Sequence, residues 1–88
     1  MNKDRRKAIS ALVEDIAKIA GQVDDFRSGV ESVRDDEQEA FDNLPESLQE
    51  GDRGQVSQEA IDALEEALFT LEDIDFDAIT SALDTAAA

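Results

Sequence analysis

Apolar residues recur at alternating steps of three and four along the first half of the chain, and this pattern constrains the fold most strongly. Ile9 is taken as heptad position a. The a series then runs through Ile16, Val23, Val30, Glu37 and Leu44, and the d series is Leu12, Ile19, Phe26, Val33 and Ala40. A 3.5-residue repeat is typical of a coiled-coil seam. It predicts one long helix over about residues 3–43, with a bend at Ser28-Gly29, a pair of residues that weakens a helix.

A second helix is expected over about residues 55–86. The residue before a proline avoids helical backbone angles, so Pro45 should end the first helix near Asn43. Residues 44–54 are predicted to form the turn, with one short helical turn from Pro45 and a capping box of Asp52 with Gln55. Two helices with a short connection form an antiparallel helical hairpin. The predicted fold is therefore all-α, with residues 1–88 in a single domain.

A lone hairpin leaves one side of each apolar stripe in water, so we expect two copies to pair as a homodimer, a four-helix bundle. The stripe of the second helix continues the three-four spacing and then drifts beyond Leu71. The residues expected to form the oligomer seam are Ile9, Leu12, Ile16, Ile19, Val23, Phe26, Val30, Val33, Ile61, Leu64, Leu68 and Leu71.

Charge is distributed very unevenly along the chain. The formal net charge is -15, yet residues 1–7 carry +3 and residues 35–88 hold seventeen acids against Arg53. Such a surface can be a plain solvated face, or it can complement a basic partner. Carboxylates on a rigid helix can imitate the phosphates that a basic nucleic-acid channel accepts. The candidate partner-binding residues are Asp35, Asp36, Glu39, Asp42, Asp62, Glu65, Glu66, Glu72, Asp73 and Asp77.

Several chemistries are disfavoured by composition. The chain has no Cys and no His, which removes thiol nucleophiles, Ser-His-Asp triads and Cys- or His-ligated metals. Strong acidity opposes direct binding to nucleic acid or to an anionic membrane. No apolar run is long enough to span a bilayer or to act as a signal peptide. We expect a cytoplasmic, non-enzymatic protein with no cofactor and no metal.

Three weaker possibilities involve carboxylates. Residues 73–84 partly match an EF-hand calcium loop, but Ala78 stands where the loop needs glycine and apolar residues keep helical spacing through the segment. Pairs such as Asp36 with Glu39 loosely match the magnesium-binding pairs of all-α nucleotide pyrophosphatases, a spacing expected by chance in so acidic a chain. Glu37 in the a series either lies at the edge of the seam or is a buried polar residue that sets its register, paired with Arg34.

The segment VRDDEQEAFDNLPESLQ at residues 33–49, with Gly51-Asp52-Arg53-Gly54 after it, resembles a block in small acidic proteins of bacteria and their phages. The resemblance continues through residues 59–67 and covers about half of the chain. It implies a helical hairpin in a phage or mobile-element setting and assigns no catalytic residue. In size and charge the chain is also similar to phage-encoded inhibitors of host defence that mimic nucleic acid.

These observations lead to one functional hypothesis and one alternative. The chain is expected to be an acidic protein that inhibits a host nucleic-acid-binding protein by occupying its basic surface, in the host cytoplasm if it is phage-encoded. The alternative is a structural coiled-coil module that binds itself or a helical partner through its apolar seam.

Overall fold

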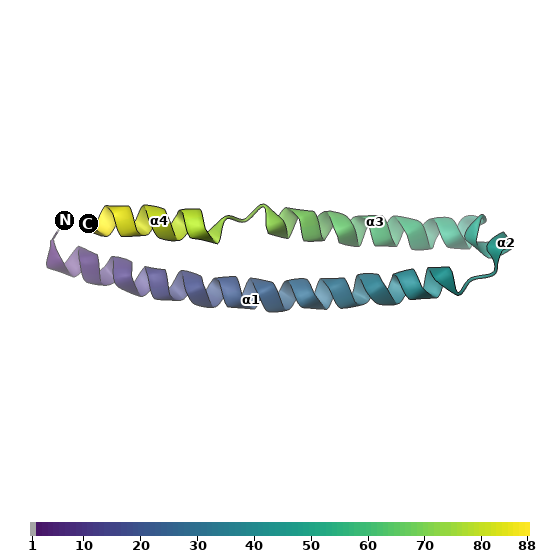
Figure 1. Ribbon diagram of the computed structural model, residues 1–88, viewed down its shortest axis with the longest axis horizontal. Coiled ribbons are helices and arrows are strands. Elements are labelled where there is room, and N and C mark those ends of the chain that lie inside the picture. Colours follow the sequence, from purple (N-terminus) through teal and green to yellow (C-terminus); the bar gives the residue numbers. More distant parts are fainter. Residues whose placement is uncertain (1) are drawn as a thin grey trace. The chain divides into compact units, whose positions relative to one another are not determined.

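The computed structural model describes residues 2–88 and is an all-α helical hairpin (Figure 1). The helices are α1 (Lys3–Asp42), α2 (Glu46–Gln49), α3 (Asp52–Glu72) and α4 (Phe76–Ala87). The predicted long helix and the short turn after Pro45 are both present. α1 is uninterrupted at Ser28 and Gly29, so the helix does not break at the expected bend.

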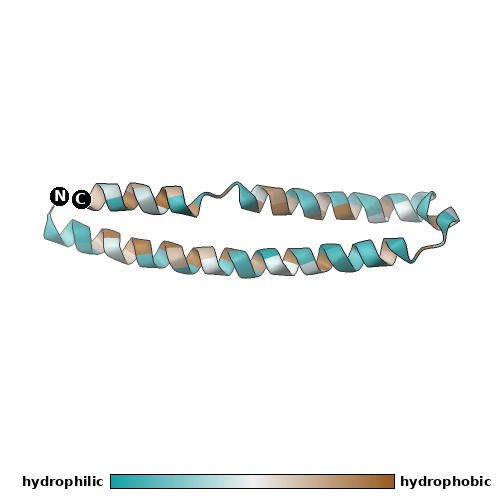
Figure 2. Cartoon of the chain, in the orientation of Figure 1, coloured by the Kyte–Doolittle hydropathy of each residue, from teal (hydrophilic) through white to brown (hydrophobic). Residues whose placement is uncertain are grey.

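The chain forms two compact units. One contains the chain up to Asp25 together with Ile74–Ala88, so the first part of α1 pairs with α4. The other is Phe26–Asp73, in which the second part of α1 is joined through α2 to α3. Figure 2 shows hydrophilic residues prevailing in the end of α1 that precedes the turn.

The turn of the second unit depends on a close backbone approach. Gly54 lies in the first turn of α3 and is buried. A Cβ at this position would come within 2.6 Å of the Cα of Gln49, and closer still to the carbonyl of that residue. The Gln49 side chain in turn donates to the carbonyl of Phe41 at 3.0 Å. The same carbonyl also accepts from the backbone N–H of Leu44 at 3.0 Å, so Gln49 adds a second hydrogen bond to the C-terminal end of α1.

The expected capping box at Asp52 is wrong. α3 already begins at Asp52, so the N-cap is Gly51, whose lack of a side chain leaves the helix without a side-chain cap. The predicted turn 44–54 is correspondingly shorter, since α2 and the start of α3 both lie inside it.

The prediction of one continuous helix over residues 55–86 is also wrong. α3 ends at Glu72, and α4 begins at Phe76 with Asp75 as its N-cap. The Asp75 carboxylate accepts a hydrogen bond from the backbone N–H of Ala78 at 2.9 Å, which satisfies one of the free donors at the start of α4. In the first unit, Phe76 and Leu83 of α4 are half-buried.

Little apolar surface is fully buried. Among the hydrophobic residues of the described chain, only Ile61 and Leu68 of α3 are buried, at 1% and 6% exposure. In α1 the a residues Ile9, Ile16, Val23 and Val30 are half-buried, whereas the d residues Leu12, Ile19, Phe26 and Val33 are exposed. Leu64 and Leu71 of α3 are half-buried. Within one chain the seam thus contains the a positions but not the d positions of α1.

Candidate functional site

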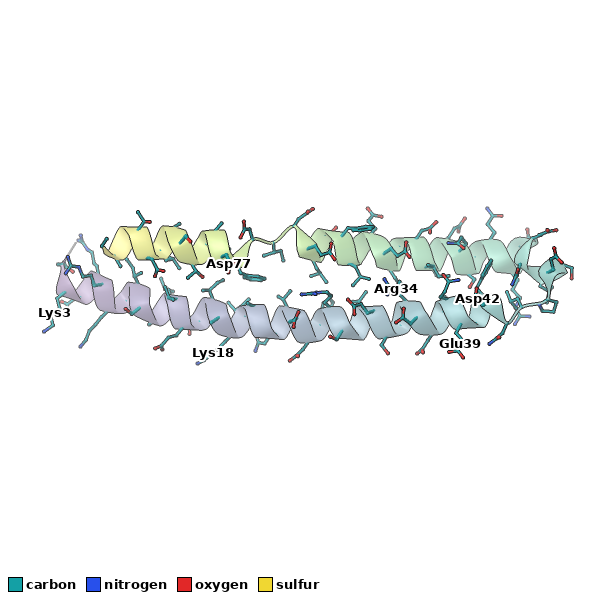
Figure 3. All side chains as sticks on the ribbon, in the orientation of Figure 1. Lys3, Lys18, Arg34, Glu39, Asp42 and Asp77 are labelled. Carbon is teal, nitrogen blue, oxygen red and sulfur yellow. The ribbon has the colours of Figure 1, made fainter. Side chains whose placement is uncertain are left out.

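The four acidic candidates on α1 lie together at its C-terminal end and are exposed. Residues 35, 39 and 42 follow at steps of four and three, so their carboxylates share one side of the helix at intervals of about 5–6 Å. Figure 3 shows Glu39 on the side of α1 that is turned away from α3. Asp36 is also exposed. This end of α1 therefore presents a row of charge to solvent.

Some of these carboxylates have polar neighbours on the same helix. Asp35 accepts two hydrogen bonds from the guanidinium of Arg34, the shorter at 3.0 Å. Asp42 accepts one from the amide of Gln38 at 3.0 Å. Both are exposed local contacts of the kind that contributes little stability, and each leaves the carboxylate open to a partner.

The acidic candidates on α3 are less uniform. Asp62, Glu66 and Glu72 are exposed, Asp73 is exposed just beyond the helix, and Glu65 is half-buried. Nine of the ten predicted acidic residues thus belong to the second unit. Asp77 is the exception, because it lies at the start of α4 in the first unit.

The second unit has two different flanks. The apolar flank consists of Phe26, Val33 and Ala40 on α1 and Val56, Ala60, Ala63 and Ala67 on α3. One shallow groove on it is lined by Phe26, Ala63, Ala67 and Thr70 together with Glu66 and Leu71. A second groove is lined by Ala40, Val56 and Ser57 together with Glu37, Leu44, Asp52 and Arg53.

The charged flank lies on the other side of the α1–α3 pair, by helical position. A groove there is lined by Glu31, Arg34, Glu65 and Glu72, with Leu68 and Phe69. Figure 3 shows Arg34 on the side of α1 that is turned toward α3. The charged flank thus combines polar side chains with Phe69, which is 65% exposed, whereas the apolar flank exposes Phe26, Val33 and Val56 at 63%, 56% and 66%.

Glu37 is held by a side chain that the sequence did not single out. The hydroxyl of Ser57, itself only 8% exposed, donates to Glu37 Oε1 at 2.5 Å. A hydrogen bond to a charged carboxylate is stronger than a neutral one. Glu37 is half-buried on the seam side of α1, and Arg34 forms its ion pair with the neighbouring Asp35. The polar pair across the helices favours the register-setting interpretation of Glu37.

The calcium loop considered at residues 73–84 does not form. Residues 76–87 are helical, so the positions that would need a loop conformation belong to α4. Asp75 uses its carboxylate to cap that helix. No group of three or more metal-ligating side chains is brought together among residues 2–88.

Among the helices of residues 2–88, none combines the length and the apolar character that crossing a membrane requires. No protein-family model, curated protein sequence or solved structure matches the chain.

Proposed function

We propose that this chain is a non-enzymatic acidic binding protein whose outer carboxylates occupy the basic surface of a nucleic-acid-binding protein. The observation that carries the proposal is the charge of one unit. Residues 26–73 contain fifteen acids and three arginines, a net charge of -12. So few bases cannot neutralise so many carboxylates, and most of the excess needs counterions or a cationic partner.

The arrangement supports imitation of a phosphate backbone. The row of Asp35, Glu39 and Asp42 follows one side of a rigid helix, with intervals comparable to those between successive phosphates of a strand. A cationic groove that follows a backbone binds charge at that spacing with little regard to the bases. The resemblance to phage-encoded inhibitors makes a host defence protein the proposed target.

A second candidate function rests on the apolar flank. Exposed apolar rows on paired helices are typical of assembly modules, which bind helical partners with little dependence on salt. The two functions can coexist in one chain, because the carboxylate row and the apolar flank occupy different sides of α1.

The test compares two triple variants with equal change of charge. The first is Asp35→Asn with Asp36→Asn and Glu39→Gln, in the second unit. The matched control is Glu14→Gln with Asp15→Asn and Asp25→Asn, at the same three heptad positions in the first unit.

Each tagged protein is used to capture partners from bacterial lysate at low and high salt, and the affinity for the captured protein is then measured. We expect the captured partner to be a basic nucleic-acid-binding protein, and added DNA should displace it from the tagged chain. The affinity of the first variant should fall about 10- to 100-fold, because it loses three surface contacts that each contribute up to about 1 kcal/mol. The affinity of the control variant should change little. Equal losses would show that net charge alone matters. A salt-resistant helical partner would favour the assembly function.

A further inference from the structure

We infer that the exposed d row of α1, formed by Leu12, Ile19, Phe26 and Val33, binds a second copy of this chain, with the two α1 helices antiparallel and Phe26 at the two-fold axis. These side chains are 51%, 45%, 63% and 56% exposed. They follow one another at exact seven-residue steps on one continuous helix. The inference concerns the apolar side of α1 and does not depend on the proposed function of its carboxylates.

Little within one chain covers the row. Among the hydrophobic residues of the described chain only Ile61 and Leu68 of α3 are buried, at 1% and 6% exposure, so the core is small. A stable dimer buries about 800 Å² on each partner, and an interface along the row would enlarge this core.

The row is self-complementary when a second copy runs in the opposite direction. With Phe26 on the axis, Ile19 of one copy faces Val33 of the other, and Leu12 faces Ala40. A two-fold interface uses the same patch on both subunits, which is the pattern seen here. Beside Phe26, the groove lined by Ala63, Ala67 and Thr70 is shallow and open. These small side chains leave room for the aromatic ring of the second copy.

Charge selects the antiparallel direction. Residues 3–7 of α1 carry Lys3, Arg5, Arg6 and Lys7 against Asp4, whereas residues 35–42 carry five acids and no base. Antiparallel α1 helices place the basic end of one copy near Asp42 and Glu46 of the other. A parallel pair would place the two acidic ends side by side, where like charges repel. The unlike charges at the two ends of α1 thus favour a second copy that runs in the opposite direction along the row.

The first test is the mass of the intact chain by light scattering or sedimentation. We expect twice 9.6 kDa for the natural sequence. Phe26→Asp should raise the dissociation constant of the dimer on the order of 100-fold, because each dimer loses two central rings. Phe69→Asp is the matched control, since Phe69 is equally exposed, at 65%, and lies on the charged flank. Circular dichroism is recorded to check that both variants keep their helices.

Direction is tested separately by disulfide formation, which is clean because the chain has no cysteine. Leu12→Cys and Ala40→Cys chains should cross-link to each other when mixed and refolded, and neither should cross-link to itself. Self-cross-linking of Leu12→Cys alone would indicate a parallel pair and overturn the inference. A folded chain that stays at the monomer mass, or a dimer that Phe69→Asp breaks and Phe26→Asp does not, would also overturn it. None of these three outcomes bears on the binding of a basic partner.

Discussion

Replacement of Gly54 by alanine should destabilise the protein, although alanine is the better helix former. Gly54 lies in the first turn of α3, directly against the backbone of Gln49. A Cβ there would overlap the Gln49 carbonyl, and backbone atoms cannot rotate away as the end of a flexible side chain can. The new methyl group can be accommodated only if α2 moves away from α3.

The magnitude follows from three contributions. Overpacking of this kind costs about 1–3 kcal/mol. Movement of α2 also weakens the hydrogen bond from Gln49 to the Phe41 carbonyl, which contributes about 1 kcal/mol. The gain in helix propensity from glycine to alanine returns about 1 kcal/mol. The net loss is about 1–3 kcal/mol, or a fall in melting temperature of roughly 5–20 °C for a domain of this size.

The matched control is the same substitution at a glycine with free space around it. A Cβ at Gly29 of α1 meets nothing within 4 Å. Gly29→Ala should therefore stabilise the protein by about 0.5–1 kcal/mol through propensity alone. Both variants are compared with the parent by thermal unfolding, followed by circular dichroism at one protein concentration. A Gly54→Ala protein that melts at or above the temperature of Gly29→Ala would refute the close approach of α2 and α3.

Two further predictions concern single hydrogen bonds. Ser57→Ala removes the donor to the half-buried Glu37 carboxylate and should lower the free energy of unfolding, measured by chemical denaturation, by about 1–2 kcal/mol. Ser32→Ala, at an exposed serine, is the control. Equal effects of the two substitutions would contradict the role of this hydrogen bond. Asp75→Ala removes the N-cap of α4 and should cost about 1 kcal/mol, with faster amide hydrogen exchange in residues 76–87 than in α3. Unchanged exchange in α4 would show that the cap is dispensable.

Much of the fold could be predicted because it depends on signals that lie close together in the sequence. The three-four spacing from Ile9 onward specifies the long helix, and Pro45 ends it. The repeat alone could not predict that the a residues of α1 are half-buried whereas its d residues are exposed. A repeat indicates which residues share a side of a helix. The number of neighbouring helices then determines whether one or both of its apolar rows are buried.

The break between α3 and α4 is difficult to predict because it contains neither glycine nor proline. Two local signals do point to it. The apolar spacing drifts after Leu71, and Asp75 precedes Ala78 at the distance of a side-chain cap. An unbroken continuation of the α3 spacing would turn Asp75 and Ala78 to the seam, whereas the break turns Phe76 toward it.

The exposure of nine of the ten acidic candidates could be predicted, since charge excess and heptad position suffice for that, whereas Glu65 is half-buried. The two contacts at the turn could not. Ser57 and Gln49 are ordinary polar residues in the sequence, and only the pairing of α1 with α2 and α3 brings them to Glu37 and to the Phe41 carbonyl. Gly54 gives a partial signal, because glycine inside a helix is costly unless another backbone lies close to it.

Competition for a captured partner tests whether the carboxylates of the second unit take the place of a nucleic-acid backbone, as we propose. Labelled DNA is bound to that partner, and the natural chain is added while fluorescence anisotropy reports release. We expect stoichiometric release of the DNA by the natural chain and weak release by the variant at Asp35, Asp36 and Glu39. A stable complex that holds the partner, the DNA and this chain together would contradict it.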